Sequence, residues 1–66
     1  MNPKYPNVKV KLVGKDGNSF SIIARVSEAM RKKKIPANEI SEFRKEAMRG
    51  NYGDLLRTCM NYVTVS

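Results

Sequence analysis

The sequence of 66 residues contains no histidine, no tryptophan and a single cysteine, Cys59. One cysteine excludes an internal disulfide, and the absence of histidine removes the usual nitrogen ligand of zinc. A lone cysteine in an apolar stretch is most often a small core residue. A chain this short has a thin core, so it must be stabilised by apolar packing alone or by a second copy of itself.

Acidic residues are also scarce, since 13 Lys and Arg oppose 6 Asp and Glu, which gives a net charge of +7. This excess favours an acidic partner, which is nucleic acid, an anionic membrane or an acidic protein surface. The first residues, MNPKYPN, lack the apolar run of a signal peptide, and no segment is long enough to span a bilayer. The sequence therefore predicts a cytoplasmic protein with no membrane contact.

Reactive side chains are too few for a catalytic site. No Ser–His or Cys–His pair exists, because histidine is absent. Glu39, Glu42 and Glu46 share a predicted helix face, as the ligands of a carboxylate metal site would. Lys45 and Arg49 lie beside them, which favours a solvated charge ladder instead. We expect no enzyme activity, no catalytic residue, no metal and no cofactor.

The amino-terminal part of the chain predicts a flexible tail and then a strand. Residues 1–7 contain two prolines and no periodicity, whereas residues 8–66 form one compact domain. From Val8 to Leu12, apolar residues alternate with Lys9 and Lys11, so the lysines should face water. The following loop, VGKDGNSF, matches neither phosphate-binding fingerprint. It predicts a turn at Asp16-Gly17 and a helix cap at Asn18 more strongly than an anion cradle.

Helical periodicity follows from Ser19 to about Lys34, with an apolar stripe of Ile22, Ile23, Val26, Ala29 and Met30. Pro36 then begins a second helix that Gly50 should close as a left-handed cap. Asn51 should cap a third helix. The inward-facing residues predicted for the second and third helices are Ile40, Phe43, Ala47, Leu55, Leu56, Cys59 and Met60. The alternating segment Asn61–Val65 predicts a closing strand. The expected fold is α+β with the order β-α-α-α-β, in which three short helices pack on a two-stranded sheet of the terminal strands.

Two basic clusters are candidate nucleic-acid-binding sites. On the outer face of the sheet, Lys9 and Lys11 should lie beside Tyr62, with Lys15 nearby, which is typical of single-strand binders. The second cluster is the run of cations at the end of the first helix, Arg31, Lys32, Lys33 and Lys34, together with Arg44, Lys45 and Arg49 on the next helix, a candidate phosphate contact. In the alternative interpretation, lysines keep an edge strand soluble and Tyr62 completes the core.

Three stretches, VKLVGKDGNSFSIIARV, ANEISEFRKEAMRGNYGDLLRTCM and NYVTV, resemble a family of small uncharacterised bacterial and phage or mobile-element proteins. The shared pattern includes DGN followed by an aromatic residue, EF…EA in the second helix, and a glycine, a tyrosine and paired leucines near the end. Ala24 departs from the usual glycine and Asn51 from the usual aspartate. The resemblance implies a phage or mobile-element setting, but it implies no activity and no catalytic residue.

The sequence thus predicts a non-enzymatic binding module with nucleic acid as its partner. The alternative is a protein-interaction module, including an inhibitor of a host factor, that contacts no nucleic acid. Two-stranded sheets gain area by pairing their edges, so a homodimer is also among the expected partners.

Overall fold

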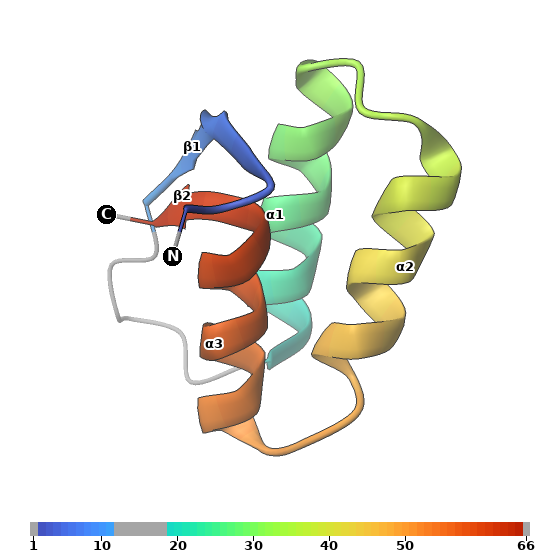
Figure 1. The fold of residues 1–66 in the computed structure, drawn as a ribbon. Helices are drawn as coiled ribbons and strands as arrows, with labels where there is room; N and C mark the ends of the chain where they lie inside the picture. The colour runs from blue at the N-terminus through green and yellow to red at the C-terminus, as the bar shows by residue number, and fades with distance from the viewer. Residues whose placement is uncertain (1, 12–18, 66) are drawn as a thin grey trace.

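The computed structural model describes residues 2–11 and 19–65, and it confirms the predicted β-α-α-α-β order (Figure 1). Predictions for Leu12, Lys15, the Asp16-Gly17 turn and the Asn18 cap lie outside these residues. The elements are β1 (Tyr5–Val10), α1 (Ser19–Lys32), α2 (Ala37–Ala47), α3 (Tyr52–Tyr62) and β2 (Val63–Val65).

The two terminal strands form a parallel pair in which Tyr5 is opposite Val63 and Val10 is opposite Val65. β1 starts at Tyr5, so the prediction that residues 5–7 belong to a flexible tail is wrong. The pairing with β2 explains this, because the Thr64 hydroxyl donates to the Pro6 carbonyl at 2.8 Å. An edge strand tolerates a proline such as Pro6.

Polar contacts attach the start of the chain to α2 and α3. The Lys4 ammonium lies 2.6 Å from a carboxylate oxygen of Glu39, and the Tyr5 hydroxyl donates to the same oxygen at 2.6 Å. These hydrogen bonds, that of Lys4 first, lower the pKa of the Glu39 carboxyl. The Lys4 backbone N–H also donates to the Asn61 carbonyl at 2.9 Å. Lys4 and Tyr5 are thus tied to α2 and α3.

One apolar core joins all five elements, and its largest fully buried side chain is Phe43. The predicted alternation in β1 is confirmed, since Val8 and Val10 are buried while Lys9 and Lys11 are exposed. The apolar face of α1 is also confirmed, with Ile22, Ile23, Val26 and Met30 buried. Met60 was predicted to face inward but is 55% exposed, because it lies on the opposite side of α3 from Leu55.

Lys34 lies in the turn after α1 and has a left-handed backbone conformation, with φ 62°. The Ile35 N–H donates to the Met30 carbonyl, and the Lys34 N–H donates to the Arg31 carbonyl. This pair of bonds is the Schellman motif, whose left-handed position is usually glycine. α1 therefore ends at Lys32, two residues before the predicted end.

The turn after α2 differs from its prediction, because neither described glycine, Gly50 or Gly53, has a positive φ. Glycine is needed at position 50 for a different reason, which is that the Asp54 side chain lies close to its backbone. A Cβ atom at Gly50 would lie 2.8 Å from the Cβ of Asp54. Asp54 belongs to a capping box in which Asn51 accepts from the Asp54 N–H at 2.9 Å. The predicted cap at Asn51 is confirmed.

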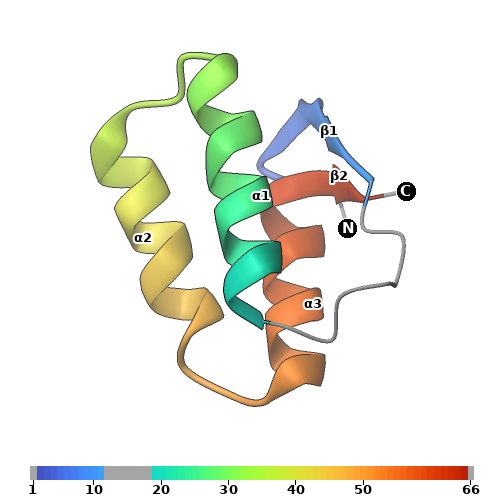
Figure 2. The same cartoon turned by 180° about the vertical axis from the view of Figure 1, so that it is seen from behind.

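α1 lies at the centre of one side of the molecule. Seen from behind, it runs between α2 and the β1–β2 ribbon (Figure 2), and it contacts both α2 and β1. Within the described ranges, no helix is long and apolar enough to cross a membrane.

Candidate nucleic-acid interface

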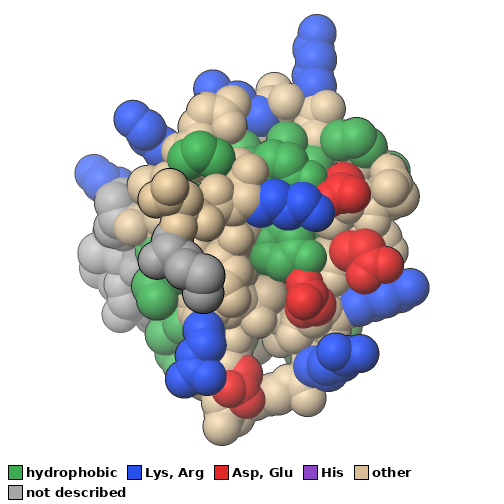
Figure 3. Space-filling view, viewed as in Figure 1, with side chains coloured by type: hydrophobic (Ala, Val, Ile, Leu, Met, Phe, Trp, Pro, Cys, Tyr) green, Lys and Arg blue, Asp and Glu red, His purple; other side chains and the backbone are tan. Residues whose placement is uncertain are grey.

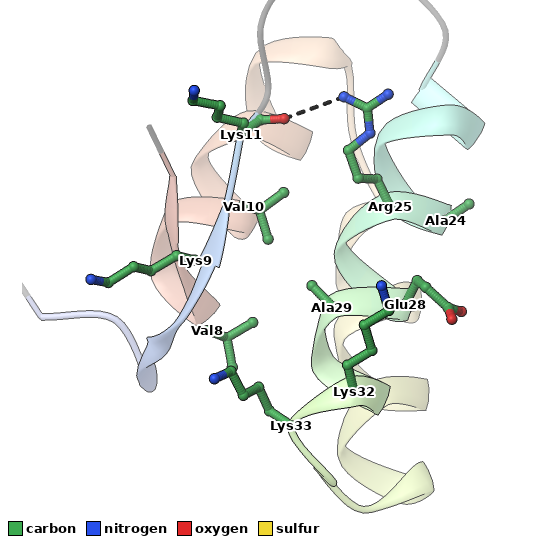
Figure 4. Close-up of a pocket in the computed structure, with 10 residues that line it drawn as sticks. All are labelled: Val8, Lys9, Val10, Lys11, Ala24, Arg25, Glu28, Ala29, Lys32 and Lys33. Atoms are coloured by element: carbon green, nitrogen blue, oxygen red, sulfur yellow. Dashed lines mark hydrogen bonds between the residues drawn. The ribbon is translucent and has the colours of Figure 1, made fainter.

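A groove with a volume of about 800 Å³ lies between β1 and α1. We call it the β1–α1 groove. Its apolar floor comes from the side of β1 that faces the helix, where Val8 and Val10 point toward Ala29 (Figure 4).

Cations surround this floor. Five cationic residues line the β1–α1 groove against one carboxylate, that of Glu28, and they are Lys9, Lys11, Arg25, Lys32 and Lys33. Two residues of the predicted strand cluster, Lys9 and Lys11, and two of the predicted helix cluster, Lys32 and Lys33, therefore line one groove. Lys33 reaches toward β1, whereas Lys9 and Lys11 extend from the other side of the strand (Figure 4).

Within the described part of the chain, the lysines of the groove are not held in ion pairs, although Glu28 lies one helical turn before Lys32. Among residues 2–11 and 19–65, none of the four lysines of the groove forms an ion pair. Glu28 is shared with a cation outside the groove, because its carboxylate lies 3.5 Å from the Arg31 guanidinium. An anion at the groove would thus meet positive charge that the described carboxylates leave uncompensated.

Arg25 was not among the predicted site residues. Its guanidinium donates to the backbone carbonyl of Lys11 at 3.2 Å and so joins α1 to the end of β1 (Figure 4). The signal in the sequence was spacing, because Arg25 and Lys32 are two helical turns apart and share one face of the helix. Only the tertiary structure shows that this face borders the strand.

A second groove lies on the other side of α1, between it and α2, with a volume of about 400 Å³. This α1–α2 groove is lined by three cations and no carboxylate, and the cations are Arg31, Arg44 and Lys45. The predicted run of cations therefore divides, since Arg31 lines the α1–α2 groove and Lys32 and Lys33 line the β1–α1 groove.

Tyr62 lies away from both grooves. It is the last residue of α3 rather than a strand residue, so the prediction that it shares the outer sheet face with Lys9 and Lys11 is wrong. Its ring packs edge-on against Phe43, with centroids 5.4 Å apart, and its hydroxyl donates to Glu46. Burial and this hydrogen bond raise the pKa of Tyr62. These contacts agree with the alternative interpretation, in which Tyr62 completes the core.

Carboxylates gather on the opposite side of the molecule, where they are visible between α2 and α3 (Figure 3). Glu39 is paired with Lys4 and Tyr5, and Glu46 accepts from Tyr62. Residues 2–11 and 19–65 contain no cluster of three acidic or cysteine side chains that could hold a metal. Glu39 and Glu46 therefore make contacts within the fold, and neither lines the two cation-lined grooves.

Substitutions at Lys34 test whether its left-handed backbone conformation destabilises the protein. We expect Lys34→Gly to stabilise the protein by about 0.5–1 kcal/mol, because glycine adopts the left-handed conformation without steric cost. In thermal denaturation this gain raises Tm by about 2–8 °C. Lys34→Ala is the control, since it removes the same charge but keeps the strained Cβ. An equal Tm in both variants would contradict strain as the cause.

Comparison with known proteins finds no matching protein family, and no curated protein or solved structure is significantly similar to the chain.

Proposed function

We propose that this protein is a non-enzymatic module that binds nucleic acid through the cationic side centred on α1. The observation that carries the proposal is the β1–α1 groove, which is lined by five cationic residues and one carboxylate, with Lys32 and Lys33 on the α1 side. A phosphodiester chain is a polyanion, and replacing its counterions with lysine and arginine provides most of the affinity in sequence-independent binding. A nucleic-acid partner fits a cytoplasmic setting and the phage or mobile-element setting that the resemblance implies.

The separation of charge on the surface supports the same partner. Two carboxylates on the α2–α3 side, Glu39 and Glu46, are engaged by Lys4, Tyr5 and Tyr62, and neither lines the β1–α1 groove. Lys34 adds a further argument, because a lysine occupies a left-handed position that favours glycine. A strained residue that carries charge next to a cationic surface is consistent with a role in binding.

The lysines at the end of α1 provide the direct test. At about 0.1 M salt, we expect Lys32→Ala/Lys33→Ala to weaken binding to an oligonucleotide about tenfold or more, because each lost phosphate contact removes a counterion-release term. The slope of log K against log salt should fall by about 1–2. Fluorescence anisotropy with a labelled oligonucleotide at about 50–200 mM salt, over which the Debye length falls about twofold, measures both quantities.

Arg49→Ala/Arg57→Ala is the matched control, since it removes the same charge from α3 and the α2–α3 turn. Arg57 lies within 4.0 Å of Asp54, and Arg49 lines a depression that contains Glu46 and Asp54. We expect less than about a twofold change there, because these cations have acidic neighbours. Equal losses in both double variants would mean that net charge alone drives binding. No binding by the wild-type protein at 50 mM salt would refute the proposal and favour the protein-interaction alternative, in which a homodimer is one form.

A further inference from the structure

α1 is a ridge between two cation-lined grooves. The β1–α1 groove lies along one side and is lined by Lys32 and Lys33. The α1–α2 groove meets the other side at Arg31, in the last turn of α1, and its other cations are Arg44 and Lys45 of α2. We propose that α1 binds in the major groove of B-form DNA, with the phosphates of the two strands in the two protein grooves. This inference rests on the proposed function and adds the duplex form and the docked element.

The outward line of α1 differs in chemistry from its flanks. Ala24 and Glu28 are four residues apart, so they lie one above the other on the helix, and both are exposed. Both residues belong to the rim of the β1–α1 groove, and their side chains point away from β1 (Figure 4). Arg31 flanks this line on the side of α2, and Lys32 flanks it on the side of β1. Cations therefore lie on both sides of a crest that carries a methyl group and a carboxylate.

This order matches what a duplex presents to an inserted helix. A helix with its side chains is about 10–12 Å wide, and the major groove of B-form DNA is about 12 Å wide. Base edges line the floor of that groove and phosphates form its two rims. A crest carboxylate would repel phosphates, but facing base edges it accepts from the cytosine amino group, and the methyl group of alanine suits the thymine methyl.

The length of the ridge sets the size of the site. α1 has 14 residues, which at 1.5 Å per residue is about 21 Å and spans about six base pairs. A single strand in the β1–α1 groove would leave the cations of the α1–α2 groove unused. Double-stranded RNA has a major groove too narrow for side chains to read, so B-form DNA is the partner that uses both grooves.

The experiment compares three labelled probes of one sequence, which are duplex DNA, single-stranded DNA and duplex RNA, by anisotropy at 100 mM salt. We expect duplex DNA to bind about tenfold or more tightly than either other probe. Arg44→Ala/Lys45→Ala in the α1–α2 groove should weaken duplex binding about as much as Lys32→Ala/Lys33→Ala does. Arg49→Ala/Arg57→Ala again serves as the control, and circular dichroism verifies that each variant is folded.

The crest is tested separately with Glu28→Ala. We expect this variant to bind random duplex DNA about twofold or more tightly, because a negative charge near DNA is removed. Any base preference that the wild-type protein selects from a randomised duplex library should become weaker. Unchanged affinity and unchanged preference would place Glu28 outside the contact.

The outcomes separate the inference from the proposed function. Equal or tighter binding of single-stranded DNA, with a loss in Lys32→Ala/Lys33→Ala but none in Arg44→Ala/Lys45→Ala, would overturn the inference and leave the proposed function standing. Binding of no probe would overturn both.

Discussion

Phe43→Ala should destabilise the protein by about 3–5 kcal/mol, the range measured for removal of a buried aromatic ring. Phe43 is 0% exposed, and its ring meets the edge of Tyr62 at an interplanar angle of 68°. A 66-residue domain has a total stability of about 3–10 kcal/mol, so this single change removes most of it. Urea denaturation followed by circular dichroism measures the loss.

Two substitutions control for the nature of the change at Phe43. Phe43→Leu keeps a large apolar side chain and should cost about 1–2 kcal/mol. Met60→Ala removes an apolar side chain that is 55% exposed, and its effect should stay within about 0.5 kcal/mol. If Phe43→Ala unfolds at the same urea concentration as Met60→Ala, Phe43 is not at the centre of the core.

Cys59 should react with iodoacetamide at least about 100-fold more slowly in the folded protein than in urea, because the thiolate is the nucleophile. The thiol is 0% exposed, and desolvation raises its pKa from 9.0 to about 11, which leaves roughly one hundredth of the usual thiolate at neutral pH. Mass spectrometry of the alkylated chain over time gives the rate.

The pH dependence identifies the state that reacts. If Cys59 reacts within the folded protein, the alkylation rate should rise about tenfold per pH unit until the pH reaches its raised pKa of about 11. If Cys59 reacts only after transient unfolding, the thiolate fraction should level off above a pH of about 9, because the unfolded thiol has its ordinary pKa. Phe43→Ala should increase the rate at neutral pH by exposing Cys59. A folded protein that reacts as fast as the urea-treated chain would show that Cys59 is accessible.

The sequence by itself determined the local structure. The alternation around Lys9 and Lys11 specified which side of β1 is buried, and the spacing of Ile22, Val26 and Met30 specified the buried face of α1. These patterns are reliable because side-chain direction follows directly from the periods of strand and helix. The cap at Asn51 was equally local, since its partner Asp54 is three residues away.

Only the tertiary structure decided which distant residues became neighbours. Residues 5–7 looked like a tail, but pairing with β2 at the far end of the chain makes them part of a strand. Tyr62 has a strand-like sequence context, but packing against Phe43 keeps it in α3. The division of Arg31 from Lys32 and Lys33 between two grooves also depends on which elements flank α1. Such contacts join residues far apart in the chain, so their energy appears in no local pattern of the sequence.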